Sequence, residues 1–384
     1  MRSYLLLFAL SFTLAFTAKP QAGWQLQNPL FPAVDYSNIS VVNDSTIVIA
    51  GGGVILITTD RGESWSFQKH PGLTVRGLYA KSAKEILLFM IYGIQKTTDG
   101  GVSYTTQYTT SDWDIYGGYF IDSLYGWAVG GSGWGVNSAG RSVYTTNGGA
   151  TWIGTQTFPP LPIFYSVKFF NRRFGIAGGQ SGSIGITTDG GVSWSVSTGT
   201  GGQYDPFVSV DFRDSSTVFA LTNGGKLMSS IDAGTNWSYA NQFSGLYIGK
   251  IKFLDTLHAF VSGSSGIIFM TSDGGGTWVQ KTPVGFAGVQ DFDMPSPGFG
   301  IAAGKAGLVV ATNDTGTTWV RLSRDQLGSI SKLCFINESH GWAPGIDGRI
   351  FRTTDGGDNW SSMQVTLRDT LMSIEFIDTL NGWI

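Results

Sequence analysis

Short runs of alternating apolar and polar residues predict β-strands along most of the chain, and these runs come in groups of four. In one group, residues 167–170 alternate as a half-buried strand, and residues 175–178, 183–188 and 194–196 supply three more. The same order returns at residues 253–280 and again at residues 335–361. Four antiparallel strands in about forty residues, repeated along a chain, are typical of the blades of a β-propeller. A solenoid is the rival architecture, but its repeats would lack this four-strand count.

Between its third and fourth strands, each group carries an octapeptide of the form [Ser/Thr]-x-[Asp/Asn]-x-Gly-x-x-[Trp/Tyr]. Its third residue recurs at intervals of 39 to 48 residues. We interpret the octapeptide as a tight turn, because the carboxylate can accept backbone N–H groups and glycine supplies a positive φ. The aromatic residue then anchors the turn to the hydrophobic layer. The eight third positions are Asp60, Asp99, Asn147, Asp189, Asp232, Asp273, Asp314 and Asp355.

This octapeptide is the Asp-box, or BNR repeat, pattern, and it resembles turns of sialidases, sortilin-type receptors, xyloglucanases and photosystem II assembly and stability factors. The order Gly-Trp-Ala-x-Gly and then Gly-x-Ile-x-x-Thr-Thr-Asp-Gly-Gly-x-x-Trp is most similar to the last group. Here it starts at Gly126-Trp127-Ala128 and Gly341-Trp342-Ala343. The resemblance covers nearly all of the chain after residue 18, and it implies an all-β propeller with these turns in a structural, non-catalytic role. It carries the fold and not the function.

Eight complete units lie between about residue 38 and residue 365. We therefore expect one propeller domain over residues 19–384 with eight four-stranded blades, and seven or nine as the alternatives. Residues 373–384 begin a ninth unit, and residues 23–27 resemble an outer strand without a blade. A composite blade made of both fragments is one way to close the ring. Because a stop in mid-blade leaves strand edges unpaired, we expect the chain to be truncated at its C-terminus.

The first residues have the pattern of a secretory signal peptide. Arg2 precedes an apolar run over residues 4–16, and the small residues Thr17 and Ala18 follow it. The run is shorter than the roughly twenty residues that a membrane span requires. We expect cleavage after residue 18 and a mature protein that is secreted, periplasmic or on the cell surface, with no membrane span.

Composition agrees with an exported β-protein. The chain has 55 glycines, 14% aromatic and 13% charged residues. Its net charge of −3 disfavours nucleic acid and anionic membranes as partners. Cys334 is the only cysteine, so no intrachain disulfide can form, and we interpret it as a small buried apolar residue.

The sequence offers little support for catalysis or metal binding. The sialidase resemblance would imply an arginine cluster, a Tyr–Glu pair and an Arg-Ile-Pro string, and that string does not occur. No pair of carboxylates is singled out for glycoside hydrolysis, which stays as the alternative function. His258 and His340 occupy equivalent turns of separate repeats, so a shared metal site is not expected. We expect no catalytic residue, no metal and no cofactor.

Insertions concentrate on one face, where the blade-to-blade connections and the turns between second and third strands lie. Because loops on a rigid scaffold are the usual carriers of binding, we predict an exposed aromatic platform there for a sugar or a peptide. The alternative is that these aromatic residues only cover the mouth of the propeller. The candidate binding residues are Asp112, Trp113, Asp114, Trp134, Tyr204 and Asp205.

The central channel is the second candidate site. Aligning the first strands on their phenylalanines places charges of both signs in one row, together with Tyr119 and Cys334. We interpret this row as a solvated ring of mutual salt bridges rather than a dedicated ion or substrate site. Its predicted channel-lining members are Lys168, Asp211, Lys252, Asp291 and Glu375.

The sequence therefore predicts a secreted, monomeric, non-catalytic propeller that binds a protein or an extracellular glycan through its loop-rich face. A sialidase-like or xyloglucanase-like glycoside hydrolase is the alternative. Arginines from several blades that converge at the channel mouth would favour the enzyme.

Overall fold

The structure is a computed structural model, and it describes residues 34–62, 64–70, 74–133, 139–155, 162–198, 205–243, 248–263, 268–280, 289–296, 299–305, 308–321, 334–344, 349–356, 361–364, 371 and 373–383. The chain divides into two compact units, one of residues 30–326 and one that joins residues 1–29 to residues 327–384. Each unit is described separately. The predicted signal peptide and the outer-strand fragment at residues 23–27 lie outside the described residues.

The described part of the larger unit contains seven four-stranded sheets, in each of which strands adjacent in sequence pair. The first three sheets are β1 (Asn38–Val41), β2 (Ile47–Gly51), β3 (Val54–Thr58) and β4 (Ser66–Lys69); β5 (Val75–Ala80), β6 (Ile86–Met90), β7 (Gly93–Thr97) and β8 (Thr105–Thr109); and β9 (Asp114–Phe120), β10 (Gly126–Ser132), β11 (Ala139–Thr145) and β12 (Ile153–Gly154). All their pairings are antiparallel.

Four further sheets continue the series with the same order of strands. They are β13 (Phe164–Phe169), β14 (Gly175–Gly179), β15 (Ser183–Thr187) and β16 (Ser195–Thr198); β17 (Phe207–Phe212), β18 (Val218–Thr222), β19 (Lys226–Ser230) and β20 (Ser238–Gln242); β21 (Ile248–Phe253), β22 (Ala259–Gly263), β23 (Ile268–Thr271) and β24 (Val279–Gln280); and β25 (Val289–Ser296), β26 (Phe299–Gly304), β27 (Val309–Thr312) and β28 (Val320–Arg321). A single 3-10 turn, η2 (Gln180–Gly182), joins β14 to β15.

The second strands of the seven sheets are buried almost throughout. All five residues of β2, β14, β18 and β22 are buried, whereas the fourth strand β4 is mostly exposed. A strand covered by neighbouring sheets on both faces must be apolar at nearly every position rather than at alternate ones. This explains why runs such as Ile47–Ala50 have no polar residue.

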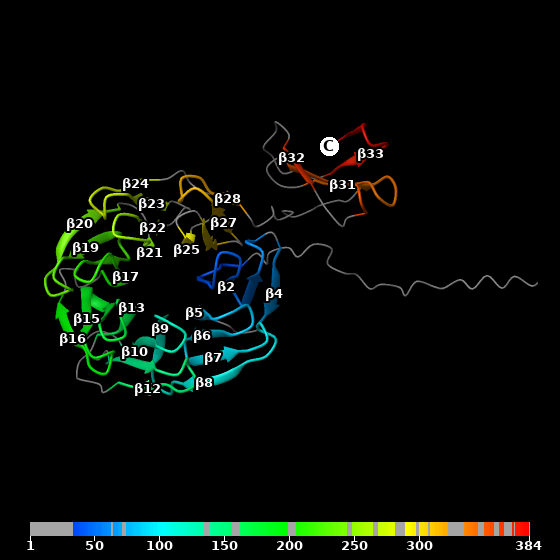
Figure 1. The fold of residues 1–384 in the computed structure, drawn as a ribbon. Helices are drawn as coiled ribbons and strands as arrows, with labels where there is room; N and C mark the ends of the chain where they lie inside the picture. Colours follow the sequence, from blue (N-terminus) through cyan, green and yellow to red (C-terminus); the bar gives the residue numbers. More distant parts are fainter. Residues whose placement is uncertain are drawn as a thin grey trace, which may run out of the picture. The chain divides into compact units, whose positions relative to one another are not determined.

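The seven sheets close into a ring (Figure 1). A separate core cluster of buried apolar side chains fills each junction between consecutive sheets. The cluster between the seventh and first sheets joins Ile301 and Val309 to Ile47 and Ile49. The backbone N–H of Tyr36 also donates to the carbonyl of Gly304 at 3.0 Å. The ring of this unit therefore consists of seven sheets.

The octapeptides form the predicted turns between third and fourth strands. In one turn, Thr187 Oγ1 donates to Asp189 Oδ1 at 2.8 Å, and the same carboxylate accepts the N–H and the hydroxyl of Ser193 at 3.0 and 2.6 Å. Gly191 has a φ of 83° and donates its N–H to Thr187 Oγ1. The hydroxyl-to-carboxylate contact recurs in all eight turns, with Asn147 supplying an amide oxygen in the third.

The smaller unit contains an eighth four-stranded sheet, as eight complete sequence repeats require, and the ninth, partial repeat forms two strands. Trp342 of the eighth sheet stacks on Phe376 of the two-stranded sheet at 4.0 Å. The strands are β29 (Cys334–Phe335), β30 (Gly341–Pro344), β31 (Arg349–Thr353) and β32 (Ser361–Gln364), with β33 (Glu375–Phe376) and β34 (Gly382–Trp383).

Candidate binding cavity on the ring axis

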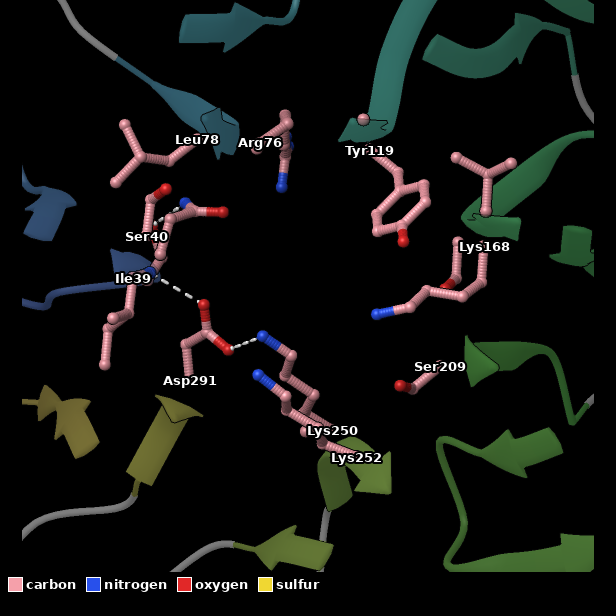
Figure 2. Close-up of a pocket in the computed structure, with 18 of the residues that line it drawn as sticks. Ile39, Ser40, Arg76, Leu78, Tyr119, Lys168, Ser209, Lys250, Lys252 and Asp291 are labelled. Atoms are coloured by element: carbon pink, nitrogen blue, oxygen red, sulfur yellow. Dashed lines mark hydrogen bonds and ion pairs between the residues drawn. The ribbon is translucent and has the colours of Figure 1, made fainter. Parts of the chain in front are cut away.

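A cavity of about 510 Å³ lies on the axis of the larger unit, lined by residues from the first strands of all seven sheets. Figure 2 shows Arg76, Tyr119, Lys168 and the pair Lys250 and Lys252 directed into this space from different strands. Cavities of roughly 300–1,000 Å³ are typical of small-ligand sites. The axis of the ring is therefore large enough for a ligand.

A β-bulge places one extra residue of a first strand at the cavity wall. The bulge interrupts the pairing of first and second strands in the second to seventh sheets. Bulges redirect side chains and are enriched near functional sites. The extra residues all line the cavity, and they differ from sheet to sheet: Arg76, Tyr116, Tyr165, Val208, Gly249 and Gln290.

Charged residues of neighbouring sheets pair at equivalent strand positions. Lys168 lies 3.5 Å from Asp211 of the next sheet. Lys252 pairs with Asp293, and Lys250 with Asp291. The predicted mutual salt bridges between adjacent blades are therefore present in the ring.

Asp291 does not occupy the strand position that was predicted for it in the row of charges. In the sixth sheet, Lys252 lies opposite Phe260 of the second strand. In the seventh sheet, Ile301 takes the place of Phe260, and the residue opposite it is Asp293, two residues after Asp291. Aligning this strand on Phe292 was wrong because Met294 occupies the place that phenylalanine takes in other repeats. Asp291 still lines the cavity, one layer away and opposite Lys250.

Side chains from one first strand cap backbone N–H groups of the next. Ser40 accepts from Ala80, Ser166 from Val210, and Ser209 from Ile251, at 2.9 to 3.3 Å. Asp211 Oδ2 accepts from Phe253 at 2.8 Å. In the smaller unit, Cys334 Sγ accepts from Phe376 in the same way at 3.2 Å. These contacts satisfy donors that would otherwise face the axis.

The lysines of the cavity differ in their proton affinity. Burial opposes the charge of Lys168, but Asp211 and Tyr119 outweigh it and raise its pKa. Burial, followed by the positive charges of Lys168 and Lys250, lowers the pKa of Lys252 to about 7. The neighbourhood of Lys252 is therefore one in which a further negative charge would be stabilised.

Arg76 stands apart from these ion pairs. Its guanidinium lies 5.8 Å from the centre of the Tyr116 ring, its side chain is exposed, and no carboxylate of a described residue forms an ion pair with it. The Tyr116 hydroxyl donates to Asp114 Oδ2 at 3.3 Å, and its ring meets Tyr165 edge-on at 5.2 Å. Arg76 is the one arginine among the described residues that line the cavity.

A second, smaller cavity of about 320 Å³ lies at the loop-rich end of the second sheet. Tyr92, 73% exposed, lines it at the turn between β6 and β7. Gln95 also lines it, and its buried Oε1 has no hydrogen-bond partner among the described residues. The carbonyl of Ile91 accepts the N–H of Ile115 in β9 at 3.0 Å, and the carbonyl of Tyr92 accepts the N–H of Thr110 at 3.1 Å. These bonds fix this surface.

The predicted aromatic platform is wrong at Trp113. Its side chain is only 7% exposed and packs in the core between the second and third sheets, beside Tyr108. The sequence indicates a loop at Trp113, and a loop position alone does not show that the indole packs into the core. Trp134 and Tyr204 lie outside the described residues.

The other predicted residues fall in separate places. Asp112 is exposed and lies 3.8 Å from Arg141. Asp114 contacts Tyr116 at the axial cavity, and Asp205 accepts the N–H of Gly224 at 3.0 Å. Glu375 belongs to the smaller unit, so the cavity of the larger unit is described without it.

Sequence reasoning missed Arg76, Tyr116 and Tyr92. The first two occupy bulges, which shift the strand pattern by one residue and hide the side chains from an alignment on phenylalanine. The signal that could reveal them is the extra residue that precedes Gly77 and Gly117 in repeats aligned from the second strand. Tyr92 follows an unbroken apolar run, with no polar insertion to mark it.

No group of three or more His, Cys, Asp or Glu side chains suited to a metal ion occurs in the described ranges. Among the same residues, no helix has the length and apolar character needed to cross a bilayer.

The chain is similar in structure to known proteins, although no protein-family profile and no curated sequence matches it. An ancestral GH74 enzyme aligns over 92% of this chain and 57% of its own, with a TM-score of 0.64 and 14% identity. The designed protein Ika8 aligns over 87% and 97%, with a TM-score of 0.56 and 10% identity. The closed ring of four-stranded antiparallel sheets and the similarity to these structures indicate the same architecture. The fold is a β-propeller.

A third similar structure is YCF48 bound to a D1 peptide, at a TM-score of 0.45 and 17% identity over 88% of this chain and 96% of that one. The chain spans little more than half the length of the GH74 enzyme. At these identities the propeller architecture is what the comparisons share, and the chemistry of each neighbour stays its own.

Proposed function

We propose that this protein is a secreted, non-catalytic propeller with Asp-box turns that binds an extracellular protein or glycan through its loop-rich face. The observation that carries the proposal is the fixed surface at the end of the second sheet. There, exposed Tyr92 adjoins a cavity in which the buried Gln95 Oε1 has no donor among the described residues. The Tyr92 ring, exposed beside this cavity, offers a partner a flat apolar face and a hydroxyl.

The engagement of the cavity carboxylates also supports a binding role over hydrolysis. Asp291 is paired with Lys250 and accepts the N–H of Ile39, and Asp293 is paired with Lys252. A glycosidase needs one carboxyl group to donate a proton and another to act as base or nucleophile. Carboxylates that are held by lysines and backbone donors are poorly suited to these tasks.

The proposal is tested by presenting the immobilised mature chain to panels of extracellular glycans and proteins. A variant with Tyr92→Ala and Asp112→Ala should lose capture of the partner. A matched control with Val102→Ala and Ile231→Ala removes two equally exposed apolar side chains from the octapeptide turns on the opposite face, and it should retain capture. Equal capture by both variants would contradict the proposal.

A further inference from the structure

The axial cavity has a cation that the ring itself does not use. Each cavity lysine faces a carboxylate of a neighbouring sheet, in the pairs Lys168–Asp211, Lys250–Asp291 and Lys252–Asp293. Among the described residues, Arg76 contacts the ring of Tyr116 and has no carboxylate partner. The bulge that carries Arg76 aims it into the cavity rather than into a core, and Figure 2 shows the guanidinium directed into this space. An exposed arginine presents donors in a fixed fork that matches a carboxylate.

The wall around Arg76 suits a sugar ring. Tyr116 and Tyr165 lie side by side from consecutive sheets, and Gln290 lines the same layer of the cavity. Tyrosine rings offer flat apolar surface together with a hydroxyl, and an amide side chain both donates and accepts hydrogen bonds. These groups match the alternating hydroxyl and C–H surfaces of a carbohydrate.

An extended peptide fits this cavity less well. Peptides that add to a sheet edge need free backbone donors and acceptors. Here the N–H groups of Ala80, Val210 and Ile251 already donate to serines of the preceding sheet, and those of Phe253 and Ile39 donate to Asp211 and Asp291. In the first, second, fifth and sixth sheets, these donors at the edge that faces the axis are therefore already occupied by side chains.

We propose that the axial cavity binds a carboxylate-bearing sugar, a uronate residue of an acidic glycan, with its carboxylate on Arg76 and its ring against Tyr116. This inference rests on the proposed binding function and names its ligand class. Asp114, which accepts the Tyr116 hydroxyl, fixes the orientation of that ring.

The test is titration calorimetry of the mature chain with digalacturonate and with its uncharged counterpart galactobiose. Digalacturonate should bind the more tightly, and raised salt should weaken it. Arg76→Gln should weaken digalacturonate by about 10- to 100-fold, as expected for loss of a charged hydrogen bond, and leave galactobiose unchanged. Arg76→Lys should lose less. Arg141→Gln, which removes a cation paired with Asp112 outside the cavity, is the matched control and should bind as the parent does.

Three outcomes would overturn the inference. These are equal affinity for the two sugars, an Arg76→Gln variant as tight as the parent, and binding of a glutamate pentapeptide with no binding of digalacturonate. Because Arg76→Gln and Arg76→Lys leave Tyr92 and Asp112 unchanged, loss of partner capture on the loop-rich face is measured independently. The two proposals can therefore fail separately.

Discussion

Asp291 Oδ2 accepts the backbone N–H of Ile39 at 2.7 Å, a contact between residues 252 positions apart that joins the seventh sheet to the first. The same carboxylate pairs with Lys250, so one buried side chain links the first strands of three sheets. Asp211 makes the same kind of contact to Phe253, one layer away, between the fifth and sixth sheets. The junction that closes the ring thus uses the same chemistry as a junction within it.

Asp291→Ala should therefore lower the free energy of unfolding by about 2–4 kcal/mol, because it leaves a buried N–H without an acceptor and Lys250 without its partner. Urea unfolding measures this loss. Asp211→Ala should cost a similar amount through Phe253 and Lys168. A neutral Asp291→Ala beside a costly Asp211→Ala would mean that the first and seventh sheets are not joined as described.

Two buried tryptophans differ in a single hydrogen bond. Trp127 stacks on Phe169 at 3.5 Å and donates from Nε1 to the carbonyl of Gly190 in the next sheet at 2.7 Å. Trp194 is as well buried, but its Nε1 has no partner among the described residues. Trp127→Phe should cost about 1–2 kcal/mol more than Trp194→Phe in thermal or chemical unfolding. Equal losses would show that the bond to Gly190 contributes nothing.

Substitutions at two neighbouring residues of one octapeptide turn should have opposite effects on stability. Ala233 has a φ of 59°, a left-handed conformation that costs a residue with a Cβ about 1 kcal/mol or more. Ala233→Gly should therefore stabilise the protein by about 1 kcal/mol. Gly234 has a φ of 88°, and a Cβ there would lie 3.0 Å from Ile176 Cδ1, so Gly234→Ala should destabilise it. Scanning calorimetry of the pair checks both signs, and two changes in the same direction would refute the assignment.

The turn carboxylates predict a loss of stability in acid. A hydrogen bond from the Ser64 hydroxyl lowers the pKa of Asp60 to about 2, and one from the Thr318 hydroxyl lowers that of Asp314 to about 2. A folded-state pKa below the unfolded value gives stability that is complete above about pH 4 and is lost as the pH falls toward 2. Melting temperatures recorded from pH 7 to pH 2.5 should show this decline.

Asn147 supplies the control for that decline, because its amide oxygen accepts the N–H of Thr151 at 3.0 Å without any titration. Asp60→Asn with Asp314→Asn should fold and should show a shallower dependence of melting temperature on pH. The same slope in the parent and the double variant would mean that other groups govern acid unfolding.

Trp113 predicts a stability effect where the sequence suggested a binding effect. Because its indole lies in the core beside Tyr108, Trp113→Ala should cost about 3–5 kcal/mol. Tyr92→Ala, at an exposed position, should change stability by less than about 0.5 kcal/mol. Far-UV circular dichroism during urea unfolding separates the two variants. A stable Trp113→Ala would restore that residue as a surface candidate.

The repeat pattern was sufficient to predict the four-stranded sheets, because strand period and turn chemistry are local properties of the chain. The octapeptide turn around Asp189 follows from residue type and spacing alone. Ring closure could not be predicted in this way, since it depends on the contact of Asp291 with Ile39. Nothing in the sequence near either residue specifies how many sheets stand between them.

The candidate site was predicted only in part, for a related reason. Lys168, Lys252 and Asp291 do line the cavity, because positions that repeat in sequence repeat in space. The bulges add a residue to six of the seven first strands and so hide Arg76 from the alignment. Met294 stands where other repeats have phenylalanine, so Asp293 rather than Asp291 belongs to the row. An insertion of one residue alters which face a side chain takes.

The caps between first strands all run in one direction, with the accepting side chain in one sheet and the donating N–H in the sheet after it. A newly duplicated repeat would supply an acceptor to the sheet after it and a donor to the sheet before it. It could therefore be inserted without sequence changes in either neighbouring repeat. This arrangement permits whole repeats to be gained or lost by changes in the gene. The curvature of the ring then sets the number of sheets at which it closes.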